Sequence, residues 1–317
     1  MIIGIDLGGT KITGAVFSPW GTVRCKQSAL LEQRQGTDVG RLVRAVITQL
    51  IASSEADGGQ VEAIGACVPG ITNSKTGTVW APNIPGWEDY PLQQELEAAF
   101  RPAQVHIASD RTCCILGESW KGAAQGCNNA LFLAVGTGIG LGILADGRIL
   151  HGHGDIAGAT GWMALGAPYR ETYKTCGCFE TYASGNGIAR QAQLRLKDGR
   201  YTKTLLRKKA PETITAEDVF CVYNRNNKDA LAGQVMDKAI AMWGMAAANL
   251  VSLFNPEKII WGGGVFGPAT QYLQRIYEEA ARWAQPVAIR QVRFEPSRLG
   301  GDAGLYGAGN LALMNKI

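Results

Sequence analysis

The chain has 317 residues, 46% of them hydrophobic and 18% charged, and this length predicts two domains because a single hydrophobic core usually stops growing at a smaller size. Its net charge of +4 is too small to indicate a nucleic-acid partner, and no stretch is apolar over a sufficient length to predict a membrane span. The first residues lack the basic segment of a secretory signal, so we expect a cytoplasmic protein with no membrane partner, whose eight cysteines stay reduced.

The first 125 residues predict three short strands and then alternating helices and strands. Runs of β-branched and apolar residues bounded by glycine or proline are typical of strands, and apolar residues three or four positions apart are typical of helices. On this basis we expect strands over residues 2–6, 11–17, 22–30, 61–68 and 104–108, and helices over residues 38–54, 91–100 and 110–125.

The same order of elements begins again at residue 130, interrupted by a long insertion over residues 151–226. Strands are expected over residues 130–135, 139–144, 148–150, 258–261 and 287–294, and helices over residues 229–254 and 268–284. The order β-β-β-α-β-α-β-α therefore occurs twice, which predicts an α/β fold with two lobes facing a cleft. We expect an N-terminal lobe over 1–115, a C-terminal lobe over 116–301, and a helix over 302–317 that packs back on the first lobe.

A glycine-rich turn stands between the first two strands of each half. Paired glycines let backbone N–H groups approach an anion closely, and a carboxylate at the end of a buried strand can hold a metal ion directly or through water. Each turn alone is equally consistent with a plain hairpin, but two turns at equivalent places predict a clamp for nucleotide phosphates. The residues are Asp6, Gly8, Gly9, Thr10 and Lys11 in the first turn and Gly136, Thr137 and Gly138 in the second.

Two further features stand at strand ends. Gly262, Gly263 and Gly264 follow a predicted strand and offer a flat backbone surface for an adenine or ribose, although a flexible loop is the simpler interpretation of this run alone. Asp110 stands where a strand meets a helix, where it serves either as a helix N-cap or as a base at the edge of the cleft.

Taken together, the motifs resemble the ROK family of sugar kinases and sugar-responsive repressors, within the actin-like, hexokinase-type ATPase superfamily of ribonuclease H-like fold. The resemblance implies ATP and Mg²⁺ as cofactors, a sugar or sugar-like substrate, and a homodimer. It rests on IDLGGTKI (5–12), CVPGI (67–71), APNIPGW (81–87), SDRTCCILGES (109–119), AVGTGIGLGI (134–143), GHGDIAGATGWM (152–163), CFETYASG (178–185), PEKIIWGGGV (256–265) and GDAGLYGAG (301–309).

The resemblance also implies a role for particular residues. Asp110 matches the catalytic aspartate, which takes a proton from the acceptor hydroxyl, and Asp6 is expected to hold Mg²⁺ through water. Phosphate contacts fall on Gly8, Gly9, Thr10 and Thr137, and adenosine contacts on Gly263 and Gly264. Substrate contacts are expected from Gly70, Asn83, Ser109, Asp110, Ala159, Trp162 and Glu180.

Three departures from the family pattern concern the substrate and a structural zinc ion. Ser109 replaces the usual asparagine, Ala159 a glutamate that binds sugar, and Trp162 a histidine that binds both sugar and zinc. Because these changes remove hydrogen-bond partners for sugar hydroxyls, we expect a modified hexose or a cyclitol rather than plain glucose. Arg111 and Lys174 could contact an acidic group, although a surface position is the simpler interpretation of each.

The remaining zinc ligands of the family pattern are too few for a closed tetrahedral site. Only Cys178 stands at a matched position, and Cys176 is out of place. His151 and His153 are near in sequence and are the alternative ligands, but a loop held by packing is favoured, so no structural zinc is expected.

Two other functions share this core. In a sugar-responsive repressor a helix-turn-helix precedes the first strand, and here the phosphate motif begins at residue 6. A non-catalytic or regulatory sugar-binding protein would account for the lost glutamate and histidine, but has little need for the base at Asp110. An ATP-dependent kinase of a sugar or polyol is therefore the favoured interpretation, with these two as alternatives.

Overall fold

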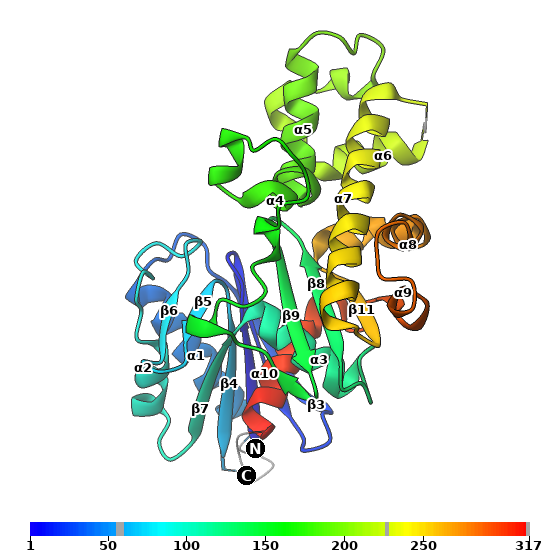
Figure 1. Cartoon of the computed structure of the whole chain (residues 1–317). Helices are drawn as coiled ribbons and strands as arrows, with labels where there is room; N and C mark the ends of the chain where they lie inside the picture. Colours follow the sequence, from blue (N-terminus) through cyan, green and yellow to red (C-terminus); the bar gives the residue numbers. More distant parts are fainter. Residues whose placement is uncertain (55–59, 226–227, 315–317) are drawn as a thin grey trace.

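The computed structural model describes residues 1–54, 60–225 and 228–314, and its framework is two five-stranded sheets of the same design (Figure 1). The strand order is β3-β2-β1-β4-β7 in the first sheet and β10-β9-β8-β11-β12 in the second. In each sheet the first three strands along the chain are antiparallel, and the last two are parallel to the first strand. This duplication confirms the predicted fold class.

The first half follows the predicted order closely. The central strands β1 and β4 are buried on both faces because helices cover the sheet, whereas the edge strand β3 alternates between half-buried and exposed residues. The elements are β1 (Ile2–Leu7), β2 (Lys11–Phe17), β3 (Val23–Leu30), α1 (Thr37–Ser54), β4 (Ala63–Val68), α2 (Leu92–Ala99), β7 (Gln104–Ser109) and α3 (Asp110–Lys121). A short hairpin of β5 (Ile71–Asn73) and β6 (Thr78–Trp80) was not predicted, because strands of three residues carry little periodicity.

The second half repeats this order around the insertion. Its elements are β8 (Ala130–Val135), β9 (Ile139–Ala145), β10 (Arg148–Ile149), α7 (Ala230–Phe254), β11 (Lys258–Gly262), α8 (Leu273–Ala281), β12 (Arg293–Pro296) and α10 (Ala303–Met314). The insertion forms α4 (Gly177–Ala183), α5 (Gly185–Lys197) and α6 (Ala216–Arg225), which all contact α7 and extend the largest hydrophobic core of the described residues (Figure 1). Within the described ranges, no helix has both the length and the apolar character needed to cross a membrane.

Two predicted elements of the second half are wrong in part. The helix expected over 268–284 begins as a 3₁₀ helix, Pro268–Tyr272, and becomes α-helical only over α8. The strand expected over 287–294 begins instead as a helical turn, α9 (Ala288–Gln291), and β12 starts at Arg293. The reason for the turn is a side chain: Gln285 Oε1 accepts hydrogen bonds from the backbone N–H groups of Val287 and Ala288, both at 2.7 Å, and so fixes the start of α9.

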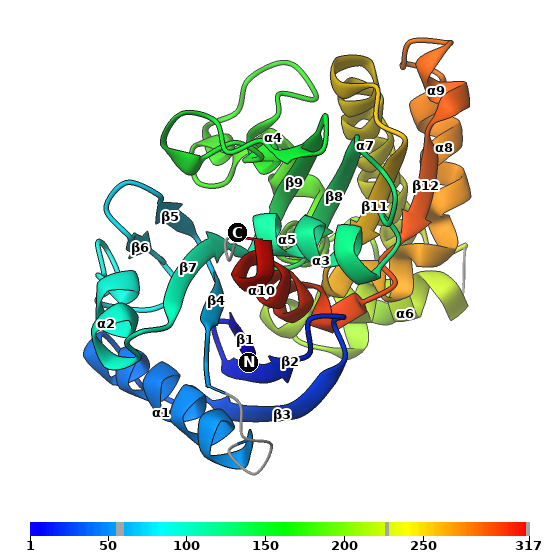
Figure 2. The same ribbon diagram turned by 90° about the horizontal axis from the view of Figure 1, so that it is seen from below.

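Helices α3 and α10 join the two sheets at the centre of the molecule (Figure 2). They pack on each other, while α3 also contacts β8 and β9 of the second sheet and α10 contacts β1 and β4 of the first. Glycines allow this close approach: a Cβ at Gly117 would lie 2.2 Å from the Ala303 carbonyl oxygen, and one at Gly307 only 1.7 Å from that of Cys113. The crossed helices therefore fix the sheets relative to each other.

The predicted lobe boundaries, 1–115 and 116–301, stay a prediction. The predicted helix over 302–317 and insertion over 151–226 extend into residues 315–317 and 226, which lie outside the described residues. The part of the last helix that the structure describes, α10, packs against the first sheet.

Candidate active site

A cavity of about 620 Å³ lies between the two sheets, where the carboxyl ends of β1, β4, β7 and β8 meet. Ligands commonly bind at the carboxyl ends of parallel strands, because loops and helix N-termini converge there. Both halves of the chain contribute to its walls. The cavity brings together eleven of the predicted site residues, namely Asp6, Gly8, Gly9, Gly70, Asn83, Asp110, Gly136, Thr137, Gly138, Glu180 and Gly263.

The two glycine turns face this cavity from opposite sheets. In the β1–β2 turn the N–H of Gly8 donates to the Lys11 carbonyl at 2.9 Å, and in the β8–β9 turn the N–H of Gly136 donates to the Gly138 carbonyl at 2.9 Å. Each turn is therefore closed by one backbone hydrogen bond, and glycines of both turns line the cavity. Such an arrangement suits an extended polyanion that is held from two sides.

Asp110 is the first residue of α3, and the N-cap position belongs to Ser109, whose side chain makes no capping bond. The Asp110 carboxylate accepts the backbone N–H of Arg111 at 2.7 Å and lines the cavity, open to solvent from that side. Surrounding protein raises the pKa of Asp110, while the Arg111 backbone N–H and charge oppose the shift. A carboxylate in this position can accept a proton from a bound hydroxyl.

Asp6 lies near the end of β1 with little water around it. Burial raises its pKa to about 6, against a hydrogen bond from the Cys67 thiol and with a further contribution from the negative charge of Asp110. The space beside it depends on Gly304 of α10, where a Cβ would lie 3.1 Å from the Asp6 carboxylate. Burying a carboxylate without a counter-charge is unfavourable, so the site is suited to a cation.

The donor chemistry around Asp6 fits Mg²⁺ that is shared with a nucleotide. Mg²⁺ prefers oxygen ligands and usually keeps several waters, with one or two protein carboxylates and substrate phosphates completing its shell. Asp6 supplies one such oxygen ligand at the cavity wall. In the described part of the chain, no three His, Cys, Asp or Glu side chains gather closely enough to hold a metal ion by themselves.

Glu180 and Asn83 line the cavity from opposite halves. Glu180 Oε2 accepts the backbone N–H of Ile139 at 2.7 Å, and burial raises the pKa of this carboxyl. Its carboxylate sits close to two glycines, because a Cβ at Gly138 or Gly161 would each lie 2.8 Å from Oε2. This packing fixes Glu180 at the glycine turn of β8–β9.

The remaining predicted residues do not line this cavity. Thr10 and Lys11 are exposed beyond the first turn, Gly262 packs against the Phe132 ring, and Gly264 lines a neighbouring cavity. Ser109 is buried, and its hydroxyl donates to Thr112 Oγ1 at 3.1 Å within the first turn of α3. Ala159 and Trp162 lie at a 3₁₀ turn that leaves 57% of the Trp162 side chain exposed outside the cavity. The structure therefore does not bring these three residues to the substrate end.

A neighbouring cavity of about 910 Å³ shares Gly136 and Thr137 with the first. Gly264 lines it, together with Phe220 and Asn224 of α6 in the insertion. A large, partly apolar hollow that adjoins the cavity with the glycine turns suits the base and ribose of a nucleotide. No sequence motif predicted the role of α6 in this cavity, because an amphipathic helix has no pattern that is specific to a ligand-binding site.

Other residues of the first cavity were missed although they lie in quoted motifs. Arg111 and Cys114 belong to the segment 109–119, Cys67 to 67–71, and Gly304 to 301–309. Their position next to matched residues was the available signal. For Arg111 a surface position was favoured over contact with an acidic group, and the structure places it in the cavity wall.

The cysteines and histidines that were considered as zinc ligands do not line this cavity. Cys178 is buried, and Cys176 Sγ lies 3.4 Å from the Thr181 hydroxyl within the same helical segment. His151 pairs instead with Asp155, with 3.5 Å between Nδ1 and Oδ1.

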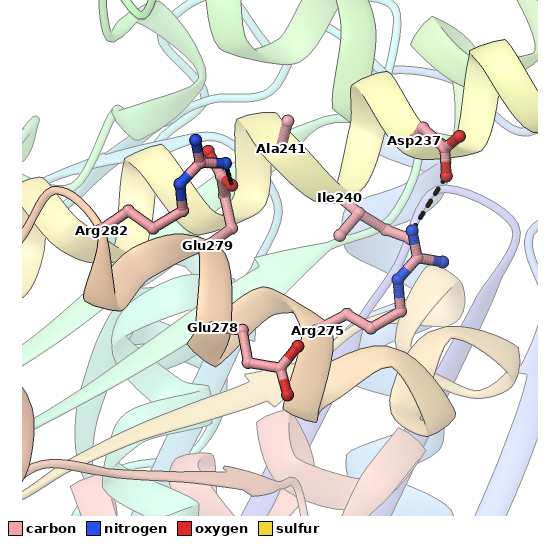
Figure 3. A pocket seen from close by; sticks show the side chains of 7 residues that line it. All are labelled: Asp237, Ile240, Ala241, Arg275, Glu278, Glu279 and Arg282. Carbon is pink, nitrogen blue, oxygen red and sulfur yellow. Dashed lines mark hydrogen bonds and ion pairs between the residues drawn. The ribbon is translucent and has the colours of Figure 1, made fainter.

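A third hollow, of about 320 Å³, lies between α7 and α8 (Figure 3). Both of its arginines are paired within the wall: Arg275 donates to Asp237 at 2.9 Å and Arg282 to Glu279 at 2.8 Å. Because its cations already have carboxylate partners, this hollow is a weaker candidate for binding an anionic ligand than the cavity between the sheets.

Two copies of this sheet around a glycine-lined cavity define an actin-like ATPase fold. The ROK family model matches residues 2–315, and the chain belongs to the ROK family. A glucokinase of Halalkalibacterium halodurans is 34% identical over 313 residues, which cover 97% of this chain and 93% of that protein.

Solved structures agree with this assignment. A ROK family glucokinase from Streptomyces griseus, in complex with glucose and AMPPNP, matches with a TM-score of 0.74 and 27% identity over 99% of each chain. A ROK family transcriptional regulator, a homologue of the E. coli MLC protein, matches with a TM-score of 0.85 and 26% identity over 99% of this chain and 78% of the regulator.

Proposed function

We propose that the protein is an ATP-dependent kinase that phosphorylates a hydroxyl of a sugar or sugar-like polyol. The observation that carries this proposal is the meeting of Asp110 with both glycine turns in one cavity. A pure sugar-binding protein needs polar contacts to hydroxyls, but it has no use for a base next to a phosphate clamp. The likeness to the glucokinases adds support, since one of them binds glucose together with an ATP analogue.

In the proposed mechanism the protein mainly positions charge. The turns at residues 8–9 and 136–138 hold the triphosphate from both sides, and Gly263 and Gly264 border the nucleoside. Asp6 would hold Mg²⁺, which would neutralise phosphate charge when bound. Asp110 accepts the proton of the acceptor hydroxyl as that oxygen attacks the γ-phosphorus, and the bond from the γ-phosphorus to the β–γ bridging oxygen breaks, so that ADP leaves. Asn83 and Glu180 orient the other hydroxyls.

The acceptor is proposed to be a modified hexose or a cyclitol rather than plain glucose. The residues at 159 and 162, which by family resemblance bind sugar as glutamate and histidine, are alanine and tryptophan here and lie away from the cavity. Each lost hydrogen bond removes about 0.5–1.5 kcal/mol of binding. Turnover of glucose at a higher kcat/KM than any modified hexose or cyclitol would show that this part of the proposal is wrong.

Release of ADP that requires an added acceptor tests the kinase proposal. The Asp110→Asn variant is expected to lose at least about 100-fold in kcat while still binding ATP. The matched control is Asp198→Asn, an exposed carboxylate paired with Arg200, which should retain activity. The alternative is a regulatory sugar-binding protein like the related transcriptional regulator. That alternative predicts sugar binding without acceptor-dependent ADP release, and sugar binding that Asp110→Asn leaves unchanged.

A further inference from the structure

Arg111 is the only cationic side chain among the described residues that line the cavity between the sheets. It follows the proposed base directly, on the first turn of α3, and its stem lies against β9 and the loop before residue 160. Arg111 Cδ lies beside Gly140 and Gly158, since a Cβ at either glycine would be in ordinary van der Waals contact with it, at 3.7 Å or 3.5 Å. The side chain is thus built into the wall rather than extended into solvent.

Most of the N–H donors of the Arg111 guanidinium form no hydrogen bond with the described protein residues. It donates one hydrogen bond, from Nη2 to the Asp155 carbonyl oxygen at 3.2 Å. A guanidinium carries five N–H donors, and burial lowers the pKa of Arg111, which reflects the loss of water around its charge. Within the described residues no carboxylate forms an ion pair with it, and Asp110 contributes only a longer-range attraction. A desolvated cation without a counter-ion is costly unless a ligand supplies one.

Lys174, a basic residue of the insertion, does not share this position. It forms an ion pair with Glu171 at 2.6 Å, is largely exposed and lies outside the cavity. Its charge is therefore already paired and solvated. Lys174 provides a matched control, since it differs from Arg111 in placement but not in charge.

We propose that Arg111 binds a carboxylate on the acceptor, so that the substrate is a sugar acid, such as a hexuronate or an aldonate. This inference rests on the proposed kinase function and names the substrate class of the same site. The planar guanidinium matches a carboxylate with two parallel hydrogen bonds. A neutral sugar leaves the cation unpaired, whereas the acid supplies the missing charge. A phosphate ester shares this chemistry and is distinguished by the experiment.

Acceptor-dependent ADP release with paired substrates tests the proposal. The pairs are glucose with glucuronate and glucitol with gluconate, and glucose 6-phosphate represents the phosphate ester. The wild-type kcat/KM is expected to favour the acid of a pair by about 10- to 100-fold, the range of a charged hydrogen bond. Arg111→Gln should remove this preference through KM, Arg111→Lys should restore part of it, and Lys174→Gln should preserve it.

Three outcomes would overturn the inference. The first is a wild-type preference for the neutral sugar of both pairs. The second is that Arg111→Gln lowers kcat/KM equally for acid and neutral acceptors and shifts the acid limb of the pH–rate profile. That result would mean that Arg111 acts through Asp110. The third is a preference for glucose 6-phosphate over both acids, which would assign the anion to a phosphate.

Binding measured by calorimetry separates this inference from the kinase proposal. With ADP present, wild-type protein should bind glucuronate more tightly than glucose, and Arg111→Gln should lose the difference. If the difference is found but no acceptor releases ADP, the kinase proposal fails and the role of Arg111 in recognition stands. Equal binding of the two sugars contradicts the inference even when glucose is phosphorylated.

Discussion

Replacing Asp6 with asparagine is expected to stabilise the empty protein while it removes activity. Burial raises the pKa of Asp6 from 3.8 to about 6 in the folded protein. The folded state therefore binds more protons than the unfolded state between these values, so this carboxyl lowers stability as pH rises from about 4 to about 6, and the penalty is complete above that. A shift of about two units corresponds to about 3 kcal/mol, which sets the upper limit of the gain in Asp6→Asn.

Denaturant unfolding at pH 8 and pH 5, without nucleotide or Mg²⁺, measures this gain. The advantage of Asp6→Asn should approach about 3 kcal/mol at pH 8 and fall to about half of that at pH 5, where the wild-type carboxyl is largely protonated when folded. Carboxylates that do not interact with Asp6 titrate alike in both proteins and cancel, whereas Asp110 and Asp302, whose charges add to the Asp6 shift, contribute a smaller difference. The control Asp198→Asn should change stability by less than about 1 kcal/mol. Lower stability of Asp6→Asn at pH 8, or an equal advantage at both pH values, would refute the reasoning.

Three further predictions concern the base and the packing of α3 and α10. Because burial raises the pKa of Asp110, the acid limb of kcat/KM should have its midpoint above pH 3.8, and a pH–rate profile with a lower midpoint contradicts this. Gly307→Ala should lose about 1–3 kcal/mol in denaturant unfolding, because its Cβ would stand 1.7 Å from a carbonyl oxygen, whereas Gly233→Ala, with open space around it, should lose nothing. Glu118 is fully buried and accepts hydrogen bonds from Ala123 and from Ser297 and Leu299 after β12, so Glu118→Ala should lower the unfolding free energy by about 3–5 kcal/mol, because each buried donor left without an acceptor costs about 1–3 kcal/mol; a loss under about 1 kcal/mol would contradict this.

The repeated fold was predictable because its signals are local. Strand-length apolar runs separated by glycine turns occur in the same order in both halves, and the structure shows the same sheet order in both. The failure over 287–294 has a different origin. Val287 and Ile289 favour a strand, but the Gln285 side chain accepts hydrogen bonds from the first N–H groups of a helical turn. The sequence alone does not show that this contact outweighs the β propensity of the two residues.

The candidate site was predictable where the backbone itself forms it, as at Gly8 and Gly136. Side chains of the acceptor end were harder to place, because their direction depends on contacts between distant segments. Arg111 lies in the cavity wall and donates to the carbonyl of Asp155, 44 residues along the chain, and Trp162 is exposed and does not line the cavity although a family motif spans it. Sequence spacing identifies the turn to which a residue belongs, but it does not identify the residues from distant segments that its side chain contacts.

The chemistry of the cavity and its cost in stability have one origin. Asp6 and Asp110 are both harder to ionise than ordinary aspartates because the surrounding protein desolvates them. Gly304 of α10 lets that helix approach Asp6, and Gly117 and Gly307 let α10 approach α3, which begins with Asp110. A looser pair of helices would solvate both carboxylates and lower the penalty, but the base would then move relative to the phosphate turns. Because cations and substrate bind the ionised folded form, ligand binding offsets the penalty in the state that performs the reaction. The tight helix crossing is therefore as much a part of the proposed active site as the residues that line it.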